Sequence, residues 1–176
     1  AGRWFVSDTK HGPLVHARLG IAEENSGKLV TTVRNEAKRI AEEQGLEYII
    51  TDGPPGIGCP VISSLSGASL ALIVTEPTLS GMHDLERVLG VCRHFGIPAL
   101  VCINKYDLNL ENAQQIESQC QDFGVGVIAR IPFDNVVTEA LIQGLPVVEY
   151  TEGQVARQIA AVWNWISGLL AARKIF

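Results

Sequence analysis

A short apolar run that ends in an acidic residue and a proline–glycine loop occupies residues 46–60 (LEYIITDGPPGIGCP). Its apolar part is typical of a strand that is buried on both faces of a parallel sheet. Asp52 follows at the carboxyl end of that strand, where open α/β sheets bind their ligands. A carboxylate in this position is suited to holding Mg²⁺ through water, next to a substrate phosphate. The alternative is that Asp52 only opens a turn, since Asp-Gly is a strong turn pair.

The loop after Asp52 combines stiff and permissive residues. Pro54 and Pro55 lack a backbone N–H and fix their own φ angles. Three glycines, with Gly56 in the middle, allow conformations and close approaches that a side chain would block. The loop is therefore suited to bringing its backbone close to a ligand.

Length and composition predict one globular domain over residues 1–176, because 47% of the chain is hydrophobic and only 19% is charged. The net charge of −5 gives no support to nucleic-acid binding through bulk electrostatics. No apolar run approaches the length of a membrane span, and the first residues lack a signal-peptide pattern. An amphipathic helix at residues 151–172 either covers the sheet, which we favour, or lies on a membrane surface.

The four cysteines are widely spaced and form no C-x-x-C pair. This spacing argues against a zinc site or an iron–sulfur cluster built from this chain alone. Cys92 and Cys102 fall in apolar patterns typical of buried free thiols. A reducing compartment, the cytoplasm, fits this usage best.

Strand and helix patterns alternate along most of the chain. Strands are predicted at residues 3–7, 14–17, 46–52, 69–75, 98–104, 125–131 and, at an edge, 146–149. Helices are predicted at residues 26–44, 61–67, 78–95, 109–123, 136–143 and 151–172. This order predicts an α/β fold with a mostly parallel sheet and helices on both faces.

Polar residues stand at the ends of successive predicted strands: Asp52, Thr75 with Glu76, Asn104 and Asp134. Because the carboxyl ends of parallel strands share one edge of a sheet, these side chains are expected to converge on one site. For Asp134, capping of the following helix is at least as good an interpretation.

Residues 104–107 (NKYD) fit N-K-x-D, a base-reading pattern of many nucleotide-binding proteins. The Asn104 amide presents both a donor and an acceptor, which suits the edge of a purine. The alternative is an ordinary turn, in which Asn and Asp are common. The Asp52 loop strengthens the nucleotide interpretation, since both segments are predicted at the same edge.

Ser26, Gly27 and Lys28 open a helical pattern. They lack the upstream glycine and the following Ser or Thr of a phosphate-binding loop, so we interpret them as a helix start. Weak anion binding at this helix start remains the alternative.

The segments DGPPGIGCPV, VTEP, INKYD and IPFD with the following GLPV together resemble the MinD/ParA/Mrp group of P-loop ATPases. The segment SDTKHGPLVHARLGIAEENSGKLV resembles the subgroup that carries an inserted ferredoxin domain. The resemblance covers nearly the whole chain. It implies a P-loop NTPase-like fold, ATP and Mg²⁺ as cofactors, a homodimer that sandwiches nucleotide, and coupling to iron–sulfur or redox chemistry with a ferredoxin or redox partner.

The resemblance also implies roles for residues on the side of the site that would hold the phosphates and Mg²⁺. Asp52 matches the Walker B aspartate near Mg²⁺, and the loop of residues 53–58 looks like switch II, which senses the γ-phosphate. Pro54 and Pro55 are thereby assigned to cofactor binding, and Gly56, with Asp52, to catalysis.

On the base side, Asn104 is similar to the adenine-contacting asparagine, and Asp107 completes its motif. The loop from Pro132 to Asp134 is expected to lie against the base.

The sequence departs from the family in two ways: neither the Walker A motif, G-K-G-G-x-G-K-[ST], nor the ferredoxin cysteines occur in it. In the family both would precede Ala1, so we expect the C-terminal part of the fold, incomplete at its N-terminus. An iron–sulfur cluster is expected only in the missing ferredoxin segment. Without the phosphate-cradling amides and lysine, the 176-residue chain is predicted not to hydrolyse ATP by itself.

The Walker A strand would lie beside the Asp52 strand, so its absence predicts a rearranged sheet or a partner chain that covers the unpaired backbone. Two other functions remain open. One is a non-catalytic domain for dimerisation or partner docking. The other is a GTPase, which N-K-x-D suggests but which Pro55, at a position where Ras-type D-x-x-G has glycine, disfavours.

Overall fold

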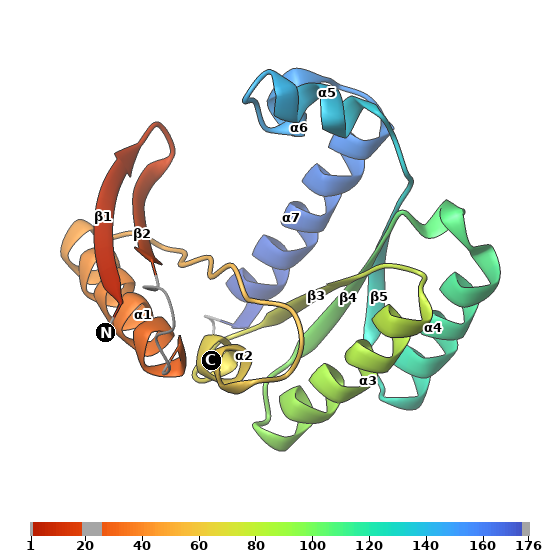
Figure 1. The fold of residues 1–176 in the computed structure, drawn as a ribbon, viewed down its shortest axis with the longest axis horizontal. Helices are drawn as coiled ribbons and strands as arrows, with labels where there is room; N and C mark the ends of the chain where they lie inside the picture. The colour runs from red at the N-terminus through yellow and green to blue at the C-terminus, as the bar shows by residue number, and fades with distance from the viewer. Residues whose placement is uncertain (1, 19–25, 174–176) are drawn as a thin grey trace. The chain divides into compact units, whose positions relative to one another are not determined.

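The computed structural model describes residues 2–18 and 26–173. The chain divides into two compact units, Ala1–Ala68 and Ser69–Phe176, and each is described by itself. The first contains β1 (Arg3–Thr9), β2 (Gly12–Arg18), α1 (Ser26–Gln44) and α2 (Cys59–Leu65). The second contains β3 (Ala71–Thr75), α3 (Leu79–His94), β4 (Ala99–Asn104), the 3₁₀ turn η1 (Tyr106–Leu108), α4 (Leu110–Asp122), β5 (Gly126–Ile131), α5 (Val136–Ile142), α6 (Val147–Tyr150) and α7 (Gln154–Arg173) (Figure 1). That residues 1–176 form a single domain stays a prediction.

In the first unit, β1 and β2 pair as an antiparallel hairpin. Phe5 lies opposite His16, and their rings stack with centroids 5.5 Å apart. Both strands predicted here are confirmed, and both are longer than predicted. The helix predicted after them is confirmed as α1, and Gly45 follows it with a φ of +65°, which a glycine adopts without strain.

Helices α1 and α2 pack closely at Gly27. A Cβ on this residue would lie only 3.3 Å from Cys59 Cβ and 3.2 Å from Ser63 Oγ. Arg34 Nη1 also donates to the Ser63 carbonyl at 2.8 Å, which ties the two helices together. Gly27 therefore has a packing role that does not require a bound anion.

The strand predicted at residues 46–52 is wrong, since these residues form no regular secondary structure. Ile49 and Ile50 are 48% and 80% exposed, instead of buried on both faces. An apolar run becomes a strand only when a neighbouring strand pairs with its backbone groups, and the neighbour that the resemblance implies is not in this sequence. Coverage of this segment by a partner chain stays a prediction.

The second unit has a three-stranded parallel sheet in the order β3-β4-β5. Helices α3 and α4 cover one face, and α7 packs on the other (Figure 1). The first core contains Leu85, Leu89, Val101, Ile103, Ala113, Ile116 and Cys120. Cys102, Ala129 and Val162 pack on the α7 side. Parallel strands with helices on both faces are confirmed for this unit, and α7 covers the sheet as favoured.

None of the helices in the described ranges combines the length and apolar character that a membrane crossing requires.

The edge strand predicted at residues 146–149 is also wrong, because this segment forms the short helix α6. The Pro146 carbonyl accepts from the amides of Glu149 and Tyr150 at 2.9 and 3.1 Å. Proline fixes φ and lacks an N–H, so it suits the start of a helix turn at least as well as the start of a strand. A four-residue apolar run does not distinguish the two.

Cys92, Cys102 and Cys120 are buried free thiols, whereas Cys59 is exposed. Burial raises the pKa of Cys102 and Cys120 to about 11, so both stay protonated near neutral pH. We expect a thiol reagent at about pH 8 to label Cys59 alone in the folded chain and every cysteine in denaturant. The matched Cys59→Ala variant should lose the labelling of the folded state. Fast labelling of a second thiol without denaturant would contradict the buried assignment.

Candidate functional site

The carboxyl ends of the three strands of the second unit meet at one edge. In the registers of the sheet, Thr75 of β3 lies beside Ile103 of β4, and Asn104 lies beside Ile131 of β5. Glu76 and Pro132 follow the outer two strands directly. The parallel sheet thus brings the ends of β3, β4 and β5 to one edge, as predicted. The convergence of the polar side chains themselves on one site stays a prediction.

The Asn104 side chain is unused at this edge. It is partly exposed, and its carboxamide makes no hydrogen bond to any other residue in the described part of the chain. The N–H donors and the carbonyl acceptor of this carboxamide, at the end of β4, are therefore not engaged by any described residue.

Lys105 turns the chain sharply after β4. It has a φ of +54°, the left-handed conformation that non-glycine residues rarely adopt. Its Nζ lies 2.8 Å from Glu76 Oε1, so an ion pair links the ends of β3 and β4. Both side chains are well exposed, so the pair contributes little to stability and mainly fixes where the turn lies.

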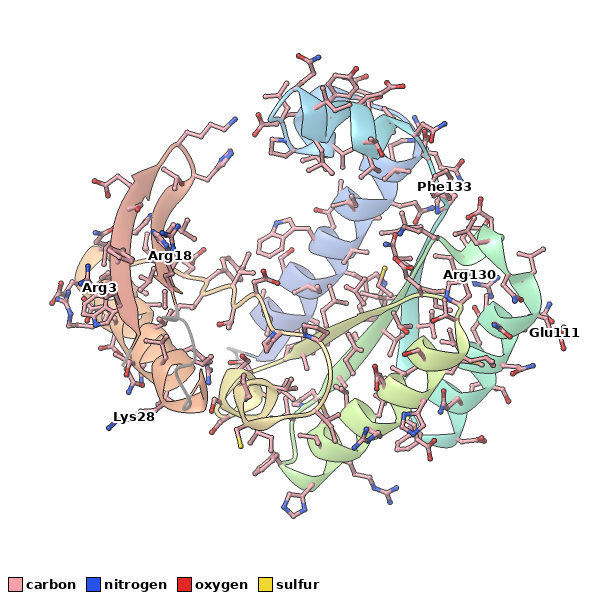
Figure 2. All side chains as sticks on the ribbon, in the orientation of Figure 1. Arg3, Arg18, Lys28, Glu111, Arg130 and Phe133 are labelled. Carbon is pink, nitrogen blue, oxygen red and sulfur yellow. The ribbon has the colours of Figure 1, made fainter. Side chains whose placement is uncertain are left out.

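Asp107 fastens the turn after β4 to the loop after β5. The Phe133 backbone N–H donates to Asp107 Oδ1 at 2.7 Å, a bond between residues far apart in the sequence. Figure 2 shows Phe133 beyond the end of β5, past Arg130, and its ring is 49% exposed. This bond therefore fixes the turn that follows Asn104 relative to the loop that begins at Pro132.

Asp134 is exposed, and its Oδ1 accepts from the Val136 N–H at 3.0 Å, at the start of α5. This bond agrees with the capping interpretation of Asp134. Contact with a base through Asp134 stays a prediction.

The other predicted site residues lie in the first unit. Asp52, Pro54 and Pro55 belong to a segment without regular structure, and Gly56 has a φ of +85° that only glycine adopts readily. The Asp52 carboxylate has no hydrogen bond or ion pair within the described residues. An unengaged carboxylate fits the oxygen chemistry that Mg²⁺ prefers. A meeting of Asp52 with Asn104 stays a prediction.

A separate hollow of about 420 Å³ lies along β5 in the second unit. Its lining residues are Tyr106, Glu117, Val127, Ile128, Ala129, Arg130, Gln154 and Gln158. Arg130 and Glu117 form an ion pair there, and none of the predicted site residues lines it. Across residues 2–18 and 26–173, no group of three or more His, Cys, Asp or Glu side chains is placed to hold a metal ion.

Two features of this edge were not predicted from the sequence. The Asp107–Phe133 bond joins segments that only the parallel sheet brings together, and no local pattern signals it. The left-handed Lys105 also lacked a signal, because such positions usually carry Gly, Asn or Asp.

No family model matches the chain. An uncharacterised protein of Methanocaldococcus jannaschii is 38% identical over 97 residues, which are 55% of this chain and 34% of that protein. A second protein of that organism is 27% identical over 94% of this chain, which spans 55% of its length. A protein of Pyrococcus horikoshii named iron–sulfur cluster carrier protein is 26% identical over 74% of this chain and 48% of its own length. Other curated relatives are septum site-determining proteins MinD.

Among solved structures, the septum site-determining protein MinD of Pyrococcus horikoshii, in complex with Mg-ADP, superposes with a TM-score of 0.64. It is 24% identical, and the match covers 82% of this chain and 58% of that one. By sequence and by structure, the relatives of this chain are therefore MinD/ParA-type P-loop ATPases, and its α/β architecture is part of their fold.

Proposed function

We propose that this chain is the nucleotide-binding and switch portion of a MinD-like ATPase associated with iron–sulfur or redox chemistry. In this proposal it reads the adenine of ATP but does not hydrolyse ATP without a Walker A segment. The observation that carries the proposal is the unused Asn104 carboxamide at the end of β4, beside the Pro132 loop.

The base side of the proposed site has a defined chemistry. The Asn104 amide offers a donor and an acceptor, the pair that the edge of adenine presents in return. Pro132 follows β5 next to Asn104, and the exposed ring of Phe133 provides an apolar surface near the same edge. These residues would bind and orient the base while the phosphates extend away from it.

Asp107 combines a place in the N-K-x-D motif with a structural bond. Its Oδ1 accepts the Phe133 amide at 2.7 Å, and the carboxylate keeps further acceptor capacity for a base. We assign Asp107 both to cofactor binding and to positioning the loop, and the GTPase alternative is disfavoured by Pro55.

On the phosphate side, Asp52 would hold Mg²⁺ through water, and the loop with Pro54, Pro55 and Gly56 would act as the switch. The exposed, unengaged carboxylate and the left-handed Gly56 support this assignment. Mg²⁺ would supply charge neutralisation at the phosphates, and the role of Asp52 is to orient the water that binds it.

The partners are proposed from the relatives. A relative named iron–sulfur cluster carrier protein supports the link to iron–sulfur chemistry, with any cluster held outside this chain. A cytoplasmic homodimer with a ferredoxin or redox partner completes the proposal. The alternative function is a non-catalytic dimerisation or docking domain, which the exposed apolar side chains of α5 favour.

The test compares ATP and GTP binding by the complete product of the gene that encodes this chain. We expect ATP to bind and Asn104→Ala to weaken its binding about tenfold, because two hydrogen bonds to the base are lost. Isothermal titration calorimetry measures both affinities.

Asn164→Ala is the matched control, since it removes an exposed amide from α7 and should leave ATP affinity unchanged. Silence toward both nucleotides would favour the docking domain, and preference for GTP would favour the GTPase. Hydrolysis by the isolated 176-residue chain would contradict the proposed need for a Walker A segment.

A further inference from the structure

The β1–β2 hairpin of the first unit carries two arginines directly opposite each other. Arg3, at the start of β1, pairs in register with Arg18, at the end of β2, and both residues are exposed (Figure 2). Neither guanidinium forms a hydrogen bond or an ion pair with any residue that the structure describes. Like charges directly opposite on neighbouring strands destabilise a sheet. The hairpin therefore holds a repulsion that no described side chain offsets.

The two arginines project from the face of the hairpin opposite to α1. Helix α1 comes close to Gly2, since a Cβ on this glycine would lie 2.5 Å from Leu29 Cδ2. Side chains alternate between the two faces of a strand, so Arg3, the next residue, projects from the other face. Asp8 is the only acidic residue between positions 2 and 18, and by the same alternation it projects from the α1 side. The arginine face therefore carries no acidic side chain of the hairpin.

An aromatic stack lies next to the arginines on the same face. Phe5 and His16 form the next cross-strand pair of this face, and their rings stack with centroids 5.5 Å apart. Ser7 Oγ and His16 Nε2 share a hydrogen bond of 3.0 Å, which holds the imidazole in place. The Phe5 side chain is 44% exposed. The face therefore combines two unpaired positive charges with an accessible aromatic surface.

A hollow of about 400 Å³ connects the aromatic stack to one of the arginines. Its lining residues are Phe5, His16, Ala17 and Arg18. This volume falls within the range of small-molecule sites in proteins. A guanidinium donates through a planar fork that matches the oxygens of a phosphate or a carboxylate. Two guanidiniums together match the nearly double negative charge of a phosphate monoester better than the single charge of a carboxylate.

We propose that this face of the hairpin binds an organic phosphate, with the phosphate group between Arg3 and Arg18 and the organic part against Phe5 and His16. The bound anion offsets the repulsion between the two guanidiniums, because both donate to it. The exposed ring surface favours an ester with an aromatic part over inorganic phosphate. None of these residues belongs to the proposed nucleotide site, so this inference does not depend on the proposed function.

The experiment titrates the 176-residue chain with phenyl phosphate and follows the NMR signals of Phe5 and His16. We expect these signals to shift in a saturable way, with binding that weakens as ionic strength rises. Arg3→Gln and Arg18→Gln should each weaken the binding about tenfold, because each removes a charge-assisted contact to the anion. Both variants should fold, since each also removes the like-charge opposition. Inorganic phosphate and benzoate should bind less tightly than phenyl phosphate, because one lacks the ring and the other lacks the second charge.

Arg39→Gln is the matched control, because Arg39 is an exposed arginine of the same unit that already forms ion pairs with Glu36 and Glu43 on α1. It should leave phenyl phosphate binding unchanged. Absence of saturable shifts, or an equal loss with Arg39→Gln, would overturn the proposal. Inorganic phosphate that binds as tightly as phenyl phosphate would contradict the role of the rings. Tighter binding of benzoate, or of a tetra-aspartate peptide, would overturn the choice of a phosphate and assign the arginines to a small carboxylate or to an acidic partner protein.

Discussion

Ile116→Ala is expected to lower the free energy of unfolding of the second unit by about 2–5 kcal/mol. Ile116 has no exposed area and packs in α4 against Leu85, Leu89 and Ile103, which come from α3 and β4. Its truncation removes buried apolar area and leaves a cavity in a core that elements from three parts of the chain enclose. Urea denaturation followed by tryptophan fluorescence measures the change, with Trp4→Phe in every variant so that Trp163 and Trp165 of α7 report.

Leu110→Ala provides the control on the same helix. Leu110 is 59% exposed, so truncating this leucine to alanine, which removes as many carbon atoms as Ile116→Ala, should change the free energy of unfolding by only about 0.5 kcal/mol or less. Equal losses in the two variants would mean that α4 does not pack on the sheet through Ile116.

The strands of the second unit were predictable because each is a buried apolar run next to a helix that glycine ends. β3, β4 and β5 fall within the ranges expected for them. Gly96 and Gly124 follow α3 and α4 closely with φ of +64° and +69°, conformations that favour glycine and stop a helix. Local sequence is enough to predict these strands, because β3, β4 and β5 pair with one another in the order in which they follow along the chain.

Residues 46–52 show where local sequence is not enough. Their apolar pattern is typical of a buried strand, yet Ile50 is exposed, because strand formation depends on a partner that the pattern does not contain. For the four-residue segment that became α6, the amides that bond the Pro146 carbonyl decided between helix and strand.

In the candidate site, too, some features could be predicted from the sequence and others could not. Parallel topology alone predicts that Asn104 lies next to the Pro132 loop, and the register confirms it. The bond between Asp107 and the Phe133 amide depends on two loops meeting in space, so no sequence pattern reports it. The exposure of Leu141 and Ile142 could not be predicted either, because large apolar residues in a helix are usually interpreted as part of the core.

Asp52→Asn in the complete gene product is expected to lower kcat for ATP hydrolysis by about 10- to 100-fold, the effect typical of losing a residue that orients a metal-bound water. The substitution keeps the size of the side chain and its oxygen acceptor but removes the negative charge. KM for ATP should change less than kcat if Asp52 acts mainly as charge develops on the phosphates. Steady-state phosphate release over a range of Mg²⁺ concentrations measures both parameters.

Glu47→Gln is the matched control for this change. Glu47 is exposed and lies five residues before Asp52 in the same segment. Its replacement by glutamine therefore removes one carboxylate charge without changing the proposed switch loop. It should leave kcat unchanged. If both variants lower kcat equally, the effect reflects the general charge of the segment. If neither does, Asp52 only opens the turn before Pro54 and Pro55. A selective loss that excess Mg²⁺ partly restores would support the proposed placement of Asp52 beside the metal, because a weaker site is filled at higher metal concentration.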